Sequence, residues 1–256
     1  MTTLSRCAPP PMPRTDYLLK TGVRERGQVQ GSGSEPVVVN QRQDLPLLSA
    51  MARQARLIVP DVAAHIIQRG NNRVACFRGA GDYLAYLTFL RELSGKFQCG
   101  LHAYCLMPNH VHLLVTPPSA EACAGMMREI GQRYARYFNR RYARTGTLWE
   151  GRFRSCVADC ARYVLACYRY IELNPVRAGL ASRPESYEWS SHSINVGQRA
   201  NVFLSPHAEF VALGTTTEAR IQAYTELIEQ ALDPAMVGAI RKATNSGHRL
   251  GTEQLP

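Results

Sequence analysis

Two histidines stand two residues apart in the segment PNHVHLLV, which covers residues 108–115. In a β-strand, side chains at positions i and i+2 point to the same face, so His110 and His112 can approach one metal ion together. Val111 and Leu113 then point to the opposite face, toward a hydrophobic core. The spacing predicts a pair of imidazole ligands. The alternative is two histidines on a solvated strand face, which a bare His-x-His spacing does not exclude.

A tyrosine and an asparagine stand four residues apart in the segment YIELNPVRAG, residues 170–179. On a helix with about 100° per residue, Tyr170 and Asn174 lie on one stripe, whereas Tyr168 lies on an apolar stripe that faces the core. Because helices usually end before X-Pro, Asn174 also suits the N-cap of a new turn that begins at Pro175. Tyr170 could equally be an ordinary tyrosine of an amphipathic helix.

The two motifs gain a shared chemistry if the fold brings them together. A tyrosine hydroxyl, with an ordinary pKa of about 10, is a poor nucleophile on its own. A divalent cation held by two imidazoles and an amide oxygen can polarise a phosphodiester and orient it for attack, while arginines hold the backbone. The product would be a phosphotyrosine ester, which keeps the energy of the broken bond and allows rejoining without ATP.

Alternation and helical periodicity predict the elements that position these residues. Their order is strand, helix, strand, strand, helix, strand, followed by one more helix that carries Tyr170. This is the split βαβ plan of ferredoxin-like α+β domains, with one antiparallel sheet and two helices on one face, so the added helix could lie against the open face. The predicted strands are 65–69, 101–106, 110–116 and 155–158, and the predicted helices are 82–97, 119–142 and 160–173, the last capped by Asp159.

The net charge of +10 is concentrated in the middle of the chain. Residues 51–185 contain 19 Lys and Arg against 9 Asp and Glu, whereas residues 186–256 contain 5 against 7. A basic surface favours a polyanionic partner, because each neutralised phosphate releases counterions. The alternatives are a role in solubility and an arginine-rich codon bias, since only three residues of the chain are lysines.

The eight cysteines form no Cys-x-x-Cys pair, and the N-terminus has no continuous apolar stretch. We therefore expect a cytoplasmic protein whose reduced cysteines fill the core, without a zinc knuckle. No run of eighteen apolar residues occurs, which excludes a membrane-spanning helix.

Three regions differ in composition. Residues 1–50, rich in Pro, Gly, Ser and Gln, predict a disordered leader, and translation could begin at Met51. Residues 51–185 would form the domain that carries both motifs. Residues 186–256 would form a small appendage, with short helices at 221–232 and 234–243.

The paired motifs resemble those of the single-tyrosine HUH transposases, in particular the REP-associated tyrosine transposases of bacteria. PNHVHLLV is similar to their His-hydrophobe-His motif, YIELNPVRAG to their tyrosine helix, and LWEGRFRS, residues 148–155, to their connector. The resemblance covers about residues 51–189 and leaves out the leader and the acidic tail.

The resemblance implies a site and a substrate. His110 and His112 would be metal ligands with Asn174 as the third, and Tyr170 would attack single-stranded DNA to give a 5′-phosphotyrosine and a free 3′-hydroxyl. The metal would be Mg²⁺ or Mn²⁺, and two imidazoles suit Mn²⁺ better.

The resemblance also implies partners. The family recognises imperfect palindromic hairpins and includes dimers, so hairpin DNA and a second copy of the chain are the expected partners. Arginines of the long helix and the connector are candidates for phosphate contacts, although a solvated helix face explains any single one of them as well. These candidates are Arg128, Arg133, Arg136, Arg140, Arg152 and Arg154.

Two other functions compete with a strand-transferring enzyme. A ferredoxin-like regulator that binds nucleic acid without catalysis would show aromatic residues on its central strands, where this chain shows His110 and His112. A metal-dependent phosphodiesterase that uses water would not need Tyr170. A covalent protein–DNA adduct separates the first function from the other two.

Overall fold

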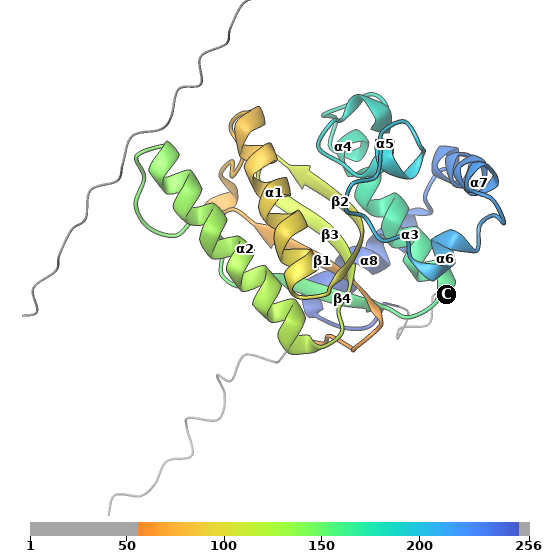
Figure 1. Cartoon of the computed structure of the whole chain (residues 1–256), viewed down its shortest axis with the longest axis horizontal. Coiled ribbons are helices and arrows are strands. Elements are labelled where there is room, and N and C mark those ends of the chain that lie inside the picture. The colour runs from red at the N-terminus through yellow and green to blue at the C-terminus, as the bar shows by residue number, and fades with distance from the viewer. Residues whose placement is uncertain (1–55, 251–256) are drawn as a thin grey trace, which may run out of the picture. The chain divides into compact units, whose positions relative to one another are not determined.

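The computed structural model describes residues 56–250, so the predicted leader and Met51 lie outside the described residues. Four strands form one antiparallel sheet in the order β2-β3-β1-β4 (Figure 1). The strands are β1 Ala63–Arg69, β2 Gly100–Met107, β3 His110–Thr116 and β4 Arg154–Ala158. The α-helices are α1 Ala80–Lys96, α2 Ala120–Arg141, α3 Ala161–Glu172, α4 Asn174–Arg177, α5 His192–Asn195, α6 Ala208–Val211, α7 Thr217–Glu229 and α8 Pro234–Ser246, and two 3₁₀ turns cover Asn71–Arg73 and Pro184–Ser186. The predicted α+β class and the split βαβ order are confirmed.

The two histidines of the sequence motif lie on an interior strand. The connection at residues 108–109 joins β2 and β3 into the predicted hairpin, which pairs Met107 with His110. On its other side β3 pairs with β1, where His112 is opposite Ile67. Because β3 has a strand on each side, its backbone is held in register along both edges.

The first face of the sheet carries the larger aromatic core. Ile66, Val111 and Leu113 point to this face and pack beneath α1 and α2, together with the fully buried Tyr86 and Tyr134. Residues two apart on a strand share a face, so this packing places the histidines of β3 on the other face. The first face therefore agrees with the predicted core.

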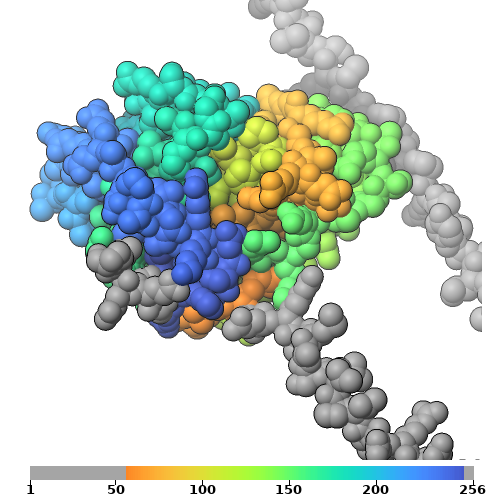
Figure 2. Space-filling model, turned by 180° about the vertical axis from the view of Figure 1, so that it is seen from behind, coloured from red at the N-terminus to blue at the C-terminus, as the bar shows by residue number. Residues whose placement is uncertain are grey.

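The second face is also covered by helices. Helix α3 packs on β2 and β3, and α8 packs on β4 and β1. Seen from behind in Figure 2, α8 in dark blue lies on the side of the molecule opposite to α1 and α2. The buried residues of this layer include Leu114, Tyr168, Ile171, Tyr224 and Ile240. Helices of the predicted appendage thus complete this layer, while the boundaries at residues 50 and 185 stay predictions.

One predicted helix cap is wrong. The N-cap of α3 is Cys160 rather than Asp159, and the Cys160 carbonyl accepts the backbone N–H groups of Tyr163 and Val164. The Asp159 carboxylate instead forms an ion pair with Arg249 at 2.7 Å. A distant partner has therefore taken the side chain that local spacing assigned to the helix end.

The cysteines of the described residues are unpaired, and all except the exposed Cys160 are buried, as expected for core-filling thiols. Between residues 56 and 250, no helix has the length and apolar character needed to cross a bilayer.

Candidate functional site

The phenol and the two imidazoles meet on the second face of the sheet. The ring centroid of His112 lies 4.8 Å from that of His110 and 5.8 Å from that of Tyr170, whose ring stands nearly perpendicular to it. Tyr170 comes from α3 and is almost fully buried. The fold thus brings together three of the four residues that the sequence predicted for the site.

Hydrogen bonds fix the orientation of His110. Asn109 donates through Nδ2 to the Arg73 carbonyl at 3.1 Å, which leaves its Oδ1 as the acceptor for His110 Nδ1 at 2.6 Å. Burial, together with the charge of Arg69, lowers the pKa of His110 to about 4, so the ring is neutral at pH 7. A neutral ring that donates through Nδ1 keeps a free lone pair on Nε2, which is the form that binds a metal.

A third histidine, His65 of β1, belongs to the same cluster. Its Nε2 lies 2.9 Å from Nδ1 of His112, and the two rings are stacked with centroids 5.1 Å apart. The His65 ring also meets the Tyr170 ring edge-on at 5.5 Å. Burial lowers the pKa of His65 to about 3 and that of His112 well below its usual range, so both rings are neutral. Sequence analysis missed His65, because a lone histidine in a strand carries no local signal.

Asn174 follows Tyr170 across a break between two helices. Leu173 ends α3 and is also the N-cap of α4, so Asn174 is the first residue of α4 rather than its N-cap. Pro175 has no N–H to continue the helix, which explains the break. Asn174 Nδ2 is buried and has no hydrogen-bond partner within residues 56–250. The amide nitrogen is therefore an unused donor, whereas a metal ion would bind the amide oxygen.

Arg177 is the second residue that sequence analysis did not assign. Its guanidinium lies 4.3 Å from the centroid of the Tyr170 ring and donates to the Tyr170 backbone carbonyl. Its Nε and Nη1 are buried and lack a partner among the described residues. Burial lowers the pKa of Arg177, and the neighbouring Tyr170 raises it. A guanidinium with unused donors beside a phenol is suited to an anionic group.

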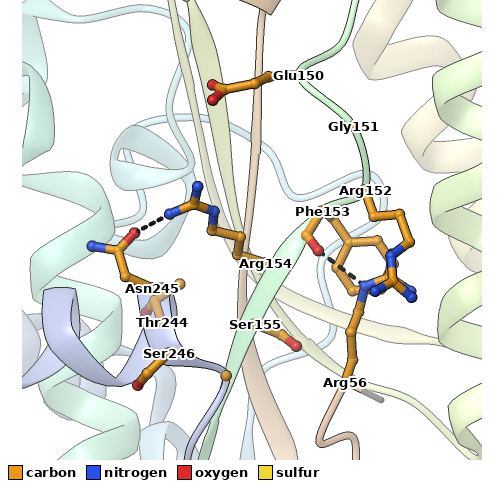
Figure 3. A pocket seen from close by; sticks show the side chains of 11 residues that line it. Arg56, Glu150, Gly151, Arg152, Phe153, Arg154, Ser155, Thr244, Asn245 and Ser246 are labelled. Atoms are coloured by element: carbon orange, nitrogen blue, oxygen red, sulfur yellow. Dashed lines mark hydrogen bonds between the residues drawn. The ribbon is translucent and has the colours of Figure 1, made fainter. Parts of the chain in front are cut away.

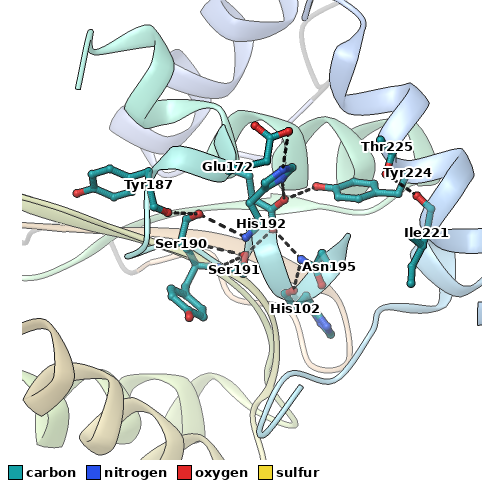
Figure 4. A network of polar contacts seen from close by, with 12 residues as sticks. His102, Glu172, Tyr187, Ser190, Ser191, His192, Asn195, Ile221, Tyr224 and Thr225 are labelled. Atoms are coloured by element: carbon teal, nitrogen blue, oxygen red, sulfur yellow. Dashed lines mark hydrogen bonds and ion pairs between the residues drawn. The ribbon is translucent and has the colours of Figure 1, made fainter. Parts of the chain in front are cut away.

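A buried carboxylate anchors the helix that carries Tyr170. Glu172 accepts from Ser191 at 2.5 Å, from Asn195 at 2.7 Å and from Tyr224 at 2.8 Å, and His192 Nδ1 lies 3.2 Å away (Figure 4). Three of these groups belong to the segment around α5, and Tyr224 belongs to α7. The network therefore fixes the end of α3 through segments that follow it in the chain.

The same segment reaches the sheet. Ser191 Oγ accepts from the backbone N–H of Tyr104 at 3.0 Å, and Ser190 pairs with Cys105 at the edge of β2. Glu172 is thereby tied to β2 through Ser191, so the end of α3 and the sheet are parts of one hydrogen-bonded assembly.

Two predicted DNA-binding arginines line a basic pocket beside β4. Arg56 donates to the Phe153 carbonyl at 2.9 Å and stacks over the Phe153 ring, and the nearby charge of Arg152 contributes, after burial, to a lowered pKa of Arg56. Arg154 extends to the other side of the strand, where it donates to Asn245 at 2.8 Å (Figure 3). Arg69 lines a small pocket with Arg152 and Arg154, and it pairs with His110 in the sheet. The basic pocket is therefore close to the histidine cluster.

The arginines of α2 lie over the first face of the sheet, away from the histidines. Arg133 forms ion pairs with Glu92 at 2.7 Å and Glu129 at 2.6 Å, so its charge is balanced locally. Arg136 and Arg140 line a shallow surface pocket with Phe89. Arg128 lines a pocket next to Met127 and Trp149 that Arg56 and Arg152 also line. Arg128, Arg152 and Arg154 therefore belong to one surface, and Arg133, Arg136 and Arg140 belong to another.

The residues present fit a divalent cation in their chemistry. Within residues 56–250, no group of three or more His, Cys, Asp and Glu side chains is arranged to hold a metal. The cluster instead offers two neutral imidazoles, so a third ligand would be the Asn174 amide oxygen, as the sequence predicts, or a substrate oxygen. Nitrogen ligands of this kind suit Mn²⁺ better than Mg²⁺, which prefers oxygen.

The chain is similar to known transposases. The family model "Transposase IS200 like" matches residues 58–174. The solved structure of a REP-associated tyrosine transposase bound to a REP hairpin is similar, with 16% identity, a TM-score of 0.50, and coverage of 62% of this chain and 96% of that one.

A putative transposase from Deinococcus radiodurans is also similar, with 16% identity, a TM-score of 0.34, and coverage of 53% of this chain and 97% of the other. A bacterial tRNA(His) guanylyltransferase-like protein has 12% identity, a TM-score of 0.34, and coverage of 51% and 67%. No curated protein sequence matches the chain.

Proposed function

Residues 58–174 belong to the IS200-like transposase family, and from this premise we propose that the chain cleaves and rejoins single-stranded DNA with Tyr170 as its nucleophile. The observation that carries this proposal is the meeting of Tyr170 with His112 at 5.8 Å between ring centroids, although the two residues come from different elements.

The reaction is a transesterification at phosphorus. The Tyr170 phenol oxygen attacks a backbone phosphate and loses its proton, and the bond from phosphorus to the 3′-oxygen breaks. That oxygen takes up a proton, which leaves a free 3′-hydroxyl and a 5′-phosphotyrosine. Attack by a 3′-hydroxyl on the same phosphorus reverses the steps, so one site can cut and rejoin.

His110, His112 and Asn174 would hold a divalent cation, Mn²⁺ or Mg²⁺. When bound, the cation would polarise the scissile phosphate and stabilise its developing charge. Both histidines are kept neutral by burial, which is the state needed for ligation.

Arg177 supplies positive charge on the nucleophile's own side. Its two unpartnered donor positions lie close to the Tyr170 ring, where they can contact the phosphate as charge accumulates on its oxygens. The bond from Arg177 to the Tyr170 carbonyl also satisfies one of the carbonyls in the last turn of α3. We therefore assign Arg177 both a positioning and an electrostatic role.

The substrate that we propose is a DNA hairpin with single-stranded flanks. The basic pocket of Arg56, Arg152 and Arg154 is next to the histidine cluster and suits the backbone of the strand to be cut. Arg128 of α2 lines a pocket together with Arg56 and Arg152 and would extend this surface, whereas Arg136 and Arg140 line a different pocket on α2 and would contact a stem. The similar REP-associated transposase was solved with a hairpin, which supports this class of substrate.

Incubation with hairpin DNA and Mn²⁺, followed by denaturing gel electrophoresis, tests the proposal. We expect a covalent adduct with the full chain, none with Tyr170→Phe, and an unchanged amount with Tyr163→Phe, a matched change on the same helix. An adduct that persists in Tyr170→Phe would show that Tyr170 is not the nucleophile. Hydrolysis without an adduct would favour the phosphodiesterase, and hairpin binding without cleavage would favour the regulator.

His110→Ala and His112→Ala separate cleavage from binding. We expect each to abolish cleavage and to leave most of the hairpin affinity in gel-shift assays, because affinity depends on the distributed arginines. Equal losses of cleavage and binding would contradict this division.

A further inference from the structure

His112 is the last member of a hydrogen-bonded chain that begins in α8. Thr244 Oγ1 donates to the Ile240 carbonyl at 2.7 Å and lies 3.0 Å from His65 Nδ1. His65 Nε2 in turn lies 2.9 Å from His112 Nδ1. His65, His112 and Thr244 are all buried, so water does not compete for these bonds. These hydrogen bonds connect α8, β1 and β3.

The Ile240 carbonyl determines which atom donates in the hydrogen bonds between Thr244, His65 and His112. Thr244 Oγ1 donates its single proton to the Ile240 carbonyl, so towards His65 Nδ1 and towards the Cys156 thiol, 3.1 Å away, the hydroxyl oxygen acts as an acceptor. The Thr244 oxygen must then accept from His65 Nδ1–H. A neutral His65 has one N–H, so its Nε2 can only accept. The proton between the two rings therefore belongs to His112 Nδ1, and the lone pair of His112 lies on Nε2.

The same result is reached independently at His110. There the Asn109 amide nitrogen donates to the Arg73 carbonyl, and the Asn109 oxygen accepts from His110 Nδ1. Two separate chains, each ending at a backbone carbonyl, thus give both histidines the same tautomer. Both rings then have a lone pair on Nε2, the nitrogen that is free to bind a metal.

We propose that His65 and Thr244 are positioning residues that hold His112 with its proton on Nδ1, so that Nε2 is free to bind the divalent cation. This inference rests on the proposed function for its purpose, but the tautomer itself does not depend on a metal. A hydrogen-bond partner on the other ring nitrogen orients a histidine ligand and increases its basicity. Thr244 would thereby make α8 part of the transposase site.

The tautomer can be read directly in the metal-free protein. Long-range ¹H–¹⁵N correlation spectra of the full ¹⁵N-labelled chain distinguish the two ring nitrogens, and His65→Phe and His112→Ala assign the signals. We expect the Nδ1–H form for His112 in the native protein and a mixture of forms in Thr244→Val, because the mutation removes the acceptor that fixes His65. A native His112 in the Nε2–H form would overturn the inference.

Calorimetric titration with Mn²⁺ alone measures the consequence. We expect Thr244→Val to weaken binding about tenfold, His65→Phe to weaken it between about tenfold and a hundredfold, and Thr244→Ser, which keeps the hydroxyl, to restore it. Thr225→Val is the matched control, because Thr225 of α7 also donates to a carbonyl four residues back, at 2.8 Å, but has no histidine neighbour. Equal affinities of Thr244→Val and Thr225→Val would overturn the inference.

His112→Ala separates this inference from the proposed function. If native protein binds Mn²⁺ and His112→Ala does not, the metal site stands whatever Thr244→Val does. If native protein and His112→Ala bind Mn²⁺ equally, the proposed metal site fails, and with it the purpose assigned to His65 and Thr244.

Discussion

His65 and Ile66 are neighbours in β1, but they point into two different environments. Ile66 enters an apolar layer of aliphatic and aromatic side chains under α1 and α2. His65 enters a layer in which neutral imidazoles, a phenol and a threonine are joined by hydrogen bonds. One face of the sheet thus stabilises the fold by packing, whereas the other also holds polar groups that must be satisfied individually.

The comparison shows why the site can be altered without loss of the fold. The first layer is mainly apolar, and the polar groups that it buries, such as the Asp82 carboxylate that accepts from Tyr142 at 2.7 Å, lie beside α1 and α2 rather than beside the histidines. The second layer depends on complete hydrogen bonding, because each unpaired buried donor or acceptor costs free energy. Four changes probe this difference.

The largest expected effect comes from Glu172→Ala. The change leaves the Ser191, Asn195 and Tyr224 donors buried without an acceptor, and we expect it to lower the free energy of unfolding by about 4 kcal/mol. Urea denaturation measures the loss. Glu226→Ala, an exposed change on α7, should cost less than about 0.5 kcal/mol. Similar losses for the two variants would mean that the polar network does not stabilise the second layer.

Two adjacent leucines of β3 compare the faces directly. Leu113 and Leu114 are both fully buried, but they pack in the first and second layers respectively. We expect Leu113→Ala and Leu114→Ala each to cost about 3 kcal/mol in urea denaturation. Only Leu114→Ala should weaken Mn²⁺ binding in calorimetry, because it opens a cavity on the side of His112. A loss of Mn²⁺ affinity in Leu113→Ala would show that the two faces are coupled.

His102 tests the cost of a neutral histidine in the second layer. It hydrogen-bonds to Ser205 and Thr116, and burial lowers its pKa to about 4. The unfolded chain takes up this proton below about pH 6.5, whereas the folded protein does so only near pH 4. Stability is therefore retained above pH 6.5 and is lost as the pH falls from 6.5 to 4, by about 2.5 kcal/mol.

Denaturation curves at pH 7 and 4.5 check this loss. In His102→Asn the difference between the two pH values should be smaller by about that amount. An unchanged difference would assign the acid sensitivity to other groups.

The smallest expected effect distinguishes the two arginine surfaces. Arg152→Ala should reduce the slope of log affinity against log salt for hairpin DNA by about 0.7, because one phosphate contact is lost. Arg133→Ala should leave the slope unchanged, because two glutamates already balance its charge. Fluorescence anisotropy at several salt concentrations measures both slopes. A larger effect for Arg133 would move the DNA interface to α2.

Much of the fold could be predicted from the sequence, because its signals are local. The alternation in β3 and the period of α2 gave the observed elements to within a few residues, and Ser119 caps α2 by accepting from Ala122. The cap assigned to Asp159 was wrong because Arg249, ninety residues later, pairs with that side chain. Local spacing cannot register a partner so far along the chain.

The residues of the candidate site likewise divide into those with a local sequence signal and those that depend on distant partners. His110, His112 and Tyr170 were predicted, since each belongs to a motif with a short period. His65 was missed because its partners are 47 and 179 residues away. Arg177 stood inside a quoted motif, but its role depends on the helix break at Pro175, which aims the guanidinium back at Tyr170. The ion pair between Arg133 and Glu92 could not be predicted either, because it depends on how α1 packs against α2.

Helix α8 is the last of the described helices to leave the ribosome, and it closes the second layer over His65. A chain that ended before Pro234 would already contain all the strands and the helices of the first layer, together with every residue assigned to cleavage. His65 would nevertheless lack the Thr244 hydroxyl that meets its Nδ1. The surroundings of His65 are therefore completed only after every strand of the sheet has been synthesised.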